Sequence, residues 1–531
     1  MSTFNRARTA ALAVSTALAL AIGAVATPAL AQERTAVSVA ADKPGPRINR
    51  HIFGQFAEHL GTGIYGGVWV GPDSPIPNVR GIRSDVVAAL KAIKVPNVRW
   101  PGGCFADEYH WRDGVGPKRR SMINSNWGNS VEPNTFGTHE FFDFAEQIGA
   151  EAYVSVNVGS GTVQEAADWM AYMTMDQRST PGQERAANGH AGQYKVKFLG
   201  IGNESWGCGG NMRPEFYADL LKLHARFARN YNTAQTGEGA MERIAVGPSD
   251  DDTSYTEGVM KAWAGRDWSW SIEGLSLHSY TVPKWPPSLP STGFGEDDYA
   301  TILKTTLKMD ERVAKHSAIM DKYDPEKKVG LYVDEWGVWL AKDPGTPEGF
   351  LQQQNSLRDG ILAALNFNIF ARHADRVRGA NIAQMVNVLQ ALILTDEGKM
   401  LLTPTYHIHK MYLPMQDAKL VPVSFDAGQY VFKDVTLPGV DAVAFRDTGG
   451  KLWISLVNLD PNKAREVTLS FTGLKARAAK GEVLTAPNVN SINTFAAPGT
   501  VVPKAIAGKV GGGKVTVALP SKAVAVLAID E

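Results

Sequence analysis

The stretch VKFLGIGNE, residues 196–204, is a short apolar run that ends on two polar residues, Asn203 and Glu204. A second stretch, VGLYVDE at 329–335, repeats the pattern and ends on Asp334 and Glu335. Short runs rich in Val, Ile, Leu and Phe that stop at Gly or at a polar group are typical of buried strands. We therefore expect two strands that each carry a carboxyl group at the carboxyl end.

Runs of this kind recur along the first 390 residues and alternate with longer segments. The expected strands are 51–58, 95–101, 152–157, 196–204, 244–249, 272–280, 329–335 and 380–389. Between them lie amphipathic segments with apolar residues at helical spacing, such as 84–94, 138–148, 214–231 and 357–373. Eight alternations of strand and helix predict an α/β fold, a (β/α)8 TIM barrel.

An open, doubly wound sheet is the alternative fold. Such a sheet usually has fewer strands and a glycine-rich, phosphate-binding turn after the first one. Here the first strand runs into EHLGTGIYGG, residues 58–67, whose glycines have neither the dinucleotide-binding nor the P-loop spacing. The closed barrel is therefore the favoured fold.

The character of the sequence changes after about residue 400. Short alternating segments separated by Gly, Pro and Asn, such as 439–445, 451–458, 466–471 and 514–519, replace the helical periodicity. This pattern predicts a C-terminal β-sandwich over 398–531, after a barrel over 48–397. Residues 32–47 contain one more alternating strand, 34–40, which we expect to pair with the sandwich.

The N-terminus has the features of a signal peptide. Arg6 and Arg8 precede an apolar run over 10–26, and Ala29-Leu30-Ala31 has the small-x-small pattern of a cleavage site. A transmembrane anchor is the alternative, but the run is short for a bilayer span, which needs about 20 residues. We expect residues 1–31 to be removed and the protein to be exported, to the periplasm or the medium, with no membrane association in the mature form.

Charge and cysteine content narrow the class of partner. Lys plus Arg and Asp plus Glu are both 54, so no global field attracts nucleic acid or anionic membranes, and a neutral partner such as a sugar fits better. Only Cys104 and Cys208 are present, so a disulfide framework cannot hold the fold together. The scattered histidines lack metal-binding spacing, and we expect no metal and no cofactor.

Glu204 and Glu335 are the candidate catalytic groups. The active sites of TIM barrels lie at the carboxyl ends of the strands, and a carboxylate ending an apolar strand is costly unless it is paired or functional. Glycoside hydrolysis needs two carboxyl groups that flank the scissile bond. The amide of Asn203 is placed to contact a sugar hydroxyl beside the reacting carbon.

Six segments then give a specific resemblance. They are FGQFAEHLG (53–61), VRWPGGCFADEYHWRDGVGP (98–117), FLGIGNESWGCGG (198–210), LSLHSYT (275–281), LYVDEWG (331–337) and MVNVLQALILT (385–395). In this order they resemble the motifs of glycoside hydrolase family 51 α-L-arabinofuranosidases, across nearly the whole chain after residue 31.

The resemblance implies retaining cleavage of terminal non-reducing α-L-arabinofuranosyl residues of arabinan- or arabinoxylan-type substrates. It makes Glu204 the acid/base and Glu335 the nucleophile. The substrate-binding residues that we expect are Glu58, Cys104, Asn203, Trp206, His278, Tyr280 and Gln390. Gln384 competes with Gln390 for one of these places, and Trp206 has packing as its alternative role. The family also implies a homo-oligomer, often a hexamer.

One position departs from the common family pattern, since Cys104 stands where many members carry Asn. A disulfide between Cys104 and Cys208 at the pocket rim and a pair of free thiols both stay open at this point. Retention predicts catalytic carboxyl groups about 5–5.5 Å apart and a raised pKa for Glu204. The competing functions are a retaining endo-glucanase or xylanase on the same barrel and a non-hydrolytic sugar-binding protein.

Overall fold

The computed structural model describes residues 33–264 and 270–531. Eight short, almost fully buried strands form the centre of the first and larger part of the chain. They form one closed barrel in chain order, and every neighbouring pair is parallel. The strands are β2 (Gly54–Phe56), β5 (Asn97–Trp100), β8 (Glu151–Val156), β9 (Val196–Ile201), β10 (Glu242–Ala245), β11 (Gly274–Thr281), β12 (Gly330–Val338) and β13 (Val377–Ile382). The predicted TIM barrel is confirmed.

Helices alternate with the strands along the chain, and most of them bury one apolar face. They are α1 (Ser84–Ala92), α2 (Thr138–Ile148), α3 (Val163–Thr174), α4 (Thr180–Ala187), α5 (Pro214–Phe227), α6 (Thr253–Trp263), α7 (Glu296–Thr306), α8 (Lys308–Tyr323), α9 (Leu357–Arg372) and α10 (Pro404–Met411). In α2, Phe141, Phe144 and Ile148 are buried at helical spacing. Glu140 accepts from the Gly137 N–H at the start of this helix, and Gly149 ends it at φ 75°.

The eighth strand ends earlier than the sequence pattern predicts. β13 stops at Ile382, and the apolar residues that follow form a buried loop instead of a longer strand. Ala383, Val388 and Leu389 pack there with Phe56 from β2. An apolar run therefore identified a buried segment here, but not its conformation.

A second stack of strands follows the barrel. It contains β16 (Lys419–Val421), β17 (Val423–Phe425), β20 (Val440–Arg446), β21 (Leu452–Asn458), β22 (Arg465–Thr472), β23 (Ala478–Leu484), β24 (Lys504–Gly511), β25 (Lys514–Leu519) and β26 (Ala523–Asp530). β24 pairs with β23 through its first half and with β25 through its second, so it passes from one sheet to the other. The two faces enclose a separate apolar core, as in a sandwich.

The N-terminal strand β1 (Glu33–Ala40) belongs to this sandwich. It runs parallel to β22 and antiparallel to β17, and Val37 and Val39 lie in the sandwich core. The sandwich strands start at β16, later than the predicted residue 398, because α10 comes first and packs on α9. α10 was missed because its eight residues are too short to show a helical period.

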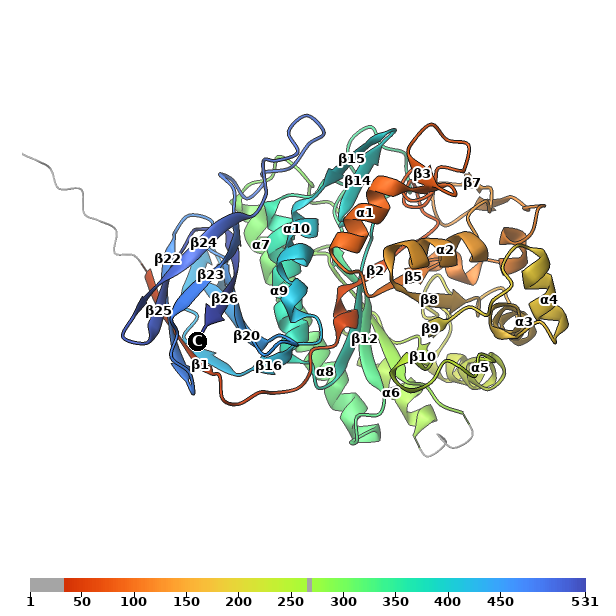
Figure 1. Cartoon of the computed structure of the whole chain (residues 1–531), viewed down its shortest axis with the longest axis horizontal. Coiled ribbons are helices and arrows are strands. Elements are labelled where there is room, and N and C mark those ends of the chain that lie inside the picture. Colours follow the sequence, from red (N-terminus) through yellow and green to blue (C-terminus); the bar gives the residue numbers. More distant parts are fainter. Residues whose placement is uncertain (1–32, 265–269) are drawn as a thin grey trace, which may run out of the picture. The chain divides into compact units, whose positions relative to one another are not determined.

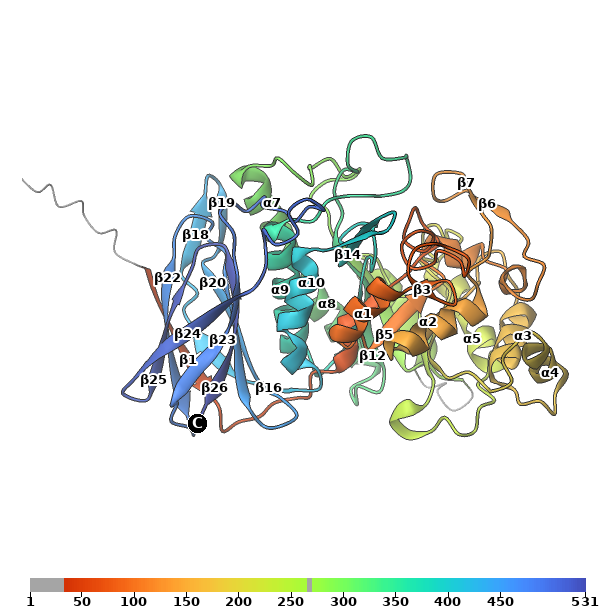
Figure 2. The ribbon, with the colours of Figure 1, turned by 45° about the horizontal axis from the view of Figure 1, so that its top comes forward.

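Helices α9 and α10 lie between the barrel strands and the sandwich (Figures 1 and 2), and α9 contacts β20, β21 and β26. Asp441 on β20 accepts hydrogen bonds from Asn368 at 2.8 Å and from Arg372 at 2.9 Å, both on α9. Small pairs of strands complete the fold. They are β3 (Asn78–Val79) with β4 (Ile82–Arg83), β6 (Met122–Asn124) with β7 (Ser130–Glu132), β14 (Ile393–Asp396) with β15 (Lys399–Leu402) and β18 (Gln429–Phe432) with β19 (Val435–Pro438). Within the described ranges, none of the helices has both the length and the apolar character that crossing a bilayer requires.

The contact between α9 and β20 gives a prediction about stability. Asp441→Ala leaves the buried Asn368 amide without its acceptor, so we expect the free energy of unfolding to fall by about 1–3 kcal/mol in urea denaturation. Asp434→Ala, at an exposed position on the same domain, is the matched control and should change it by less than about 0.5 kcal/mol. Equal effects of the two substitutions would show that the α9–β20 contact contributes nothing.

Candidate active site

Two glutamates and a histidine meet at the carboxyl ends of three barrel strands. Glu204 follows β9, His278 lies in β11 and Glu335 lies in β12. One oxygen of each carboxyl group and one ring nitrogen of His278 all lie within 4.8 Å of one another. The strand ends therefore bring the two predicted catalytic carboxyl groups to one place, although 131 positions separate them in the chain (335 − 204).

Glu335 is held by two donors from neighbouring strands. Arg99 on β5 donates to Oε1 at 2.7 Å, and the Tyr280 hydroxyl on β11 donates to Oε2 at 2.8 Å. Arg99 also donates to the side-chain oxygen of Asn203 at 2.6 Å. Sequence reasoning missed Arg99, although an arginine between Val98 and Trp100 in a fully buried strand was a usable sign of a buried carboxylate partner.

Glu204 shares its histidine with another acid. His278 Nδ1 lies 2.8 Å from Glu204 Oε1, and Nε2 lies 3.4 Å from Asp334 Oδ1. Burial raises the pKa of Glu204, the hydrogen bond from His278 opposes this, and the charge of Glu335 raises it further. Burial alone would lower the pKa of His278, but the surrounding carboxylates outweigh it and raise that pKa to about 10. The site therefore pairs an imidazolium with a carboxyl group whose pKa lies above its usual range.

Asp107 fixes the backbone that carries Asn203 and Glu204. Its carboxylate accepts from the N–H groups of Asn203 at 2.8 Å and Val158 at 2.7 Å. The backbone needs such support because Glu204 has a φ of 38°, in the left-handed region that residues with a side chain rarely adopt. Asp107 thus acts on the position of the acid, not on an arginine of its own loop.

Glu58, at the end of β2, forms another wall of the site. It accepts from Trp127 Nε1 at 2.8 Å and from Gln384 Nε2 at 2.9 Å, and it is buried. Burial first, and then the charge of Glu335, raise the pKa of Glu58 to about 7. A carboxyl group in this state can either donate to or accept from a sugar hydroxyl near neutral pH.

Gln390, predicted to bind the sugar, makes its side-chain hydrogen bonds to the scaffold. Its side-chain oxygen accepts from the Val338 N–H at 2.8 Å, and its nitrogen donates to the Asp359 carbonyl at 2.8 Å and to Thr405. The side chain is fully buried, so it serves the scaffold. Gln384, the competing glutamine, is the one that reaches Glu58 and the site.

The two cysteines form a disulfide, with their Cα atoms 5.5 Å apart. Cys104 follows β5 and Cys208 follows β9, so the bond joins two loops at the carboxyl end of the barrel. Cys208 Sγ lies 3.4 Å from Glu204 Oε2. Of the two states that the sequence left open, the structure has the oxidised one, in contact with the candidate acid.

Trp206 is held by contacts with the barrel. Its indole N–H donates to the Gly247 carbonyl at 3.1 Å, and its ring packs against the barrel core while remaining partly exposed. These are packing contacts, and sugar stacking on the exposed part of the ring stays a prediction.

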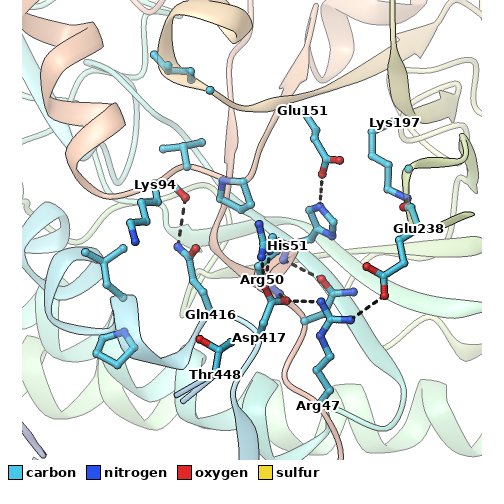
Figure 3. A pocket seen from close by; sticks show the side chains of 18 of the residues that line it. Arg47, Arg50, His51, Lys94, Glu151, Lys197, Glu238, Gln416, Asp417 and Thr448 are labelled. Carbon is cyan, nitrogen blue, oxygen red and sulfur yellow. Dashed lines mark hydrogen bonds and ion pairs between the residues drawn. The ribbon is translucent and has the colours of Figure 1, made fainter. Parts of the chain in front are cut away.

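A further cavity lies away from these residues. It has a volume of about 1170 Å³, and the residues that line it lie near the amino ends of the barrel strands (Figure 3). Its charged groups pair with one another: Arg47 and Arg50 contact Asp417, and His51 contacts Glu151. Residues at this end of a TIM barrel usually serve stability, so the catalytic end remains the candidate site.

Comparisons with known proteins agree with this location. The model described as α-L-arabinofuranosidase 1 domain matches residues 89–288, and the model described as α-L-arabinofuranosidase C-terminal domain matches residues 334–522. Together these ranges contain Arg99, Glu204, His278 and Glu335.

Solved structures and a curated relative extend the match over most of the chain. An arabinofuranosidase of family 51 from Xanthomonas axonopodis pv. citri superposes with a TM-score of 0.90 at 52% identity, covering 94% of this chain and all of that one. The α-L-arabinofuranosidase from Thermotoga maritima, in complex with arabinose, gives 0.81 at 31% identity, covering 94% and 100%. An intracellular exo-α-L-arabinofuranosidase from Bacteroides ovatus is 46% identical, covering 94% of this chain and 96% of that one.

The prediction of export is wrong by this comparison, because the Bacteroides ovatus relative is named intracellular. The predicted signal peptide, residues 1–31, lies outside the described residues. An apolar run preceded by arginines is a pattern of composition only. Here it predicted the periplasm or the medium, which disagrees with the name of the relative.

The family itself follows from agreement at three levels. The six motifs lie on the barrel strands and the loops that follow them, the two family models match in chain order, and a relative of 46% identity spans 94% of the sequence. The chain belongs to the α-L-arabinofuranosidases of glycoside hydrolase family 51.

Proposed function

We propose that this protein is an exo-acting α-L-arabinofuranosidase that removes terminal non-reducing α-L-arabinofuranosyl residues, with retention, from arabinan- or arabinoxylan-type saccharides. The approach of Glu204 and Glu335 carries the proposal, because one oxygen of each lies within 4.8 Å of the other. Retaining glycosidases separate their carboxyl groups by about 5–5.5 Å and inverting ones by about 6.5–9.5 Å. This geometry leaves no room for a water molecule between nucleophile and sugar, and it supports retention.

In the first step Glu335 is the nucleophile and Glu204 the acid. Arg99 and Tyr280 hold both oxygens of Glu335, which orients the carboxylate for attack on the anomeric carbon. The raised pKa of Glu204 keeps a proton available for the departing oxygen. A covalent glycosyl-enzyme and a free leaving group result.

In the second step Glu204 becomes the base. Forming the ester removes the negative charge of Glu335, which had raised the pKa of Glu204. The pKa of Glu204 therefore falls, and its ionised form, which can accept a proton from water, is favoured at the moment when a base is required. Water attacks the anomeric carbon, the bond to Glu335 breaks, and arabinose leaves with its configuration retained.

The sugar contacts are assigned to residues around this pair. We propose that Glu58, supported by Gln384, and the side-chain amide of Asn203 bind hydroxyl groups of the arabinose ring. His278 and Tyr280 act through the carboxyl groups that they touch, and Cys104 contributes to the rim.

An endo-glucanase or xylanase on the same barrel is not favoured, because a bifunctional glucanase-xylanase named CelM2 shares only 13% identity with this chain, at a TM-score of 0.59. Such a likeness extends to the fold alone. The homo-oligomer, a hexamer by the family resemblance, stays a prediction that light scattering can test.

The catalytic assignment predicts the behaviour of two variants. Glu335→Ala should lower kcat for 4-nitrophenyl α-L-arabinofuranoside by at least about a thousandfold, because the covalent step is lost. Glu204→Ala should also lose activity, and azide should restore it by attacking the glycosyl-enzyme without base assistance. Proton NMR of the first-formed product should show retention. Inversion, or full activity in either variant, would overturn the assignment.

The raised pKa of Glu204 predicts the alkaline side of the pH profile. Wild-type kcat/KM should fall as pH rises through that pKa, since the acid form is then lost. In Glu204→Ala, with a leaving group that needs no protonation, this limb should disappear. A limb that persists in the variant would instead point to Glu58, whose pKa is about 7.

The two glutamines give a paired prediction. Gln384→Ala should lower kcat/KM about tenfold or more, since Glu58 loses a donor at the sugar site. Gln390→Ala should chiefly lower the free energy of unfolding, by about 1–3 kcal/mol, because it leaves the buried Val338 N–H and Asp359 carbonyl unpaired. The reverse pattern would restore Gln390 to the sugar site.

A further inference from the structure

A row of three aromatic rings leads outward from Glu335. The Tyr280 hydroxyl donates to Glu335 Oε2 at 2.8 Å, and the Tyr280 ring meets Trp339 edge to face with centroids 5.2 Å apart. Trp339, partly buried, meets Trp285 in the same way at 5.3 Å. The row therefore connects the candidate nucleophile to the surface in two ring-to-ring steps.

Trp285 is the outermost ring and has most of its surface free. It is 68% exposed, the largest exposed fraction among the bulky apolar side chains in the described part of the chain. Leaving an indole ring in water forgoes the free energy that its burial would contribute. An exposed tryptophan that continues a row of aromatic rings from a catalytic site is better explained by a ligand than by the fold.

The loop that carries Trp285 is held in place. It follows β11, and its far end is anchored by the Leu289 carbonyl, which accepts from the Ala341 N–H at 3.0 Å, and by Ser291, which donates to Asp343 at 2.5 Å. Four prolines between residues 283 and 290 restrict the backbone further. A ring presented by such a loop loses little conformational entropy on contact with a ligand.

The direction of the row identifies which part of a substrate it meets. If the proposed function holds, the terminal arabinose is enclosed among Glu58, Glu204 and Glu335 at the inner end. Everything that extends from there to the surface then belongs to the leaving group. The face of a sugar ring carries C–H groups of partial positive charge, which pack well on the negative face of an indole.

We propose that Trp285 is a specificity-determining residue that stacks on a sugar of the leaving group, beyond the one joined to the scissile bond. This inference rests on the proposed function. It makes the enzyme favour arabinofuranosyl groups carried on oligosaccharides or polysaccharides over those carried on a short leaving group.

The test compares two kinds of substrate, one with a short leaving group and one with an oligosaccharide leaving group, in Trp285→Ala, Trp285→Phe and a control variant. Kinetics are measured on 4-nitrophenyl α-L-arabinofuranoside and on an arabinofuranosyl-substituted xylo-oligosaccharide, with arabinotriose in parallel. Phe227→Ala is the matched control, because Phe227 is 49% exposed at the last residue of α5 and far from the catalytic ends of the strands. It should leave both substrates unchanged.

For Trp285→Ala we expect kcat/KM on at least one oligosaccharide to fall about tenfold, mainly through KM, while the nitrophenyl substrate changes by less than about twofold. Trp285→Phe, which keeps a ring, should recover part of the loss. An equal fall on both substrates, or no fall on either oligosaccharide, overturns the inference while the proposed function stands. A wild type without activity on the nitrophenyl substrate removes the proposed function, and this inference with it.

Discussion

The balance of charge at the carboxyl end of the barrel is the constraint on which the site depends. Arg99 and His278 supply two buried positive charges, and Asp334 and Glu335 supply two negative ones. These four charges cancel, so an ionised Glu204 adds a negative charge that they do not compensate. Burying an uncompensated charge costs several kcal/mol, so the same balance that permits the cluster to exist also raises the pKa of Glu204. Structure and reactivity thus follow from one requirement.

The sequence revealed the acids of this cluster but not their partners. Glu204 and Glu335 end apolar strands, and in a barrel the carboxyl ends converge, so the pattern alone placed them together. Arg99 lies inside a buried strand, 236 positions before the carboxylate that it contacts, and nothing local in the sequence names that partner. Pairings across the barrel depend on which side chains point inward at the same height, which strand patterns do not specify.

The remaining errors share a physical origin. The run over 380–389 is apolar because it is buried, yet only its first three residues belong to β13, and the rest form a loop whose side chains pack with Phe56. Burial decides composition, whereas backbone hydrogen bonding decides conformation. Gln384 and Gln390 lie on that loop. Neither the strand period nor the helix period applies there, so the sequence did not predict which of the two side chains faces the site.

The two sides of the site are held by different means, and this separates chemistry from recognition. On the side of the acid, the Cys104–Cys208 disulfide and the hydrogen bonds of Asp107 fix the backbone around Glu204. On the other side, contact passes from Glu335 through Tyr280 to Trp339 and only then to the surface. A change at the outer end of the aromatic row reaches the nucleophile only through two intervening rings, each packed in place. Preference for a leaving group can therefore vary at the surface while the buried charge balance, and with it the catalytic step, stays the same.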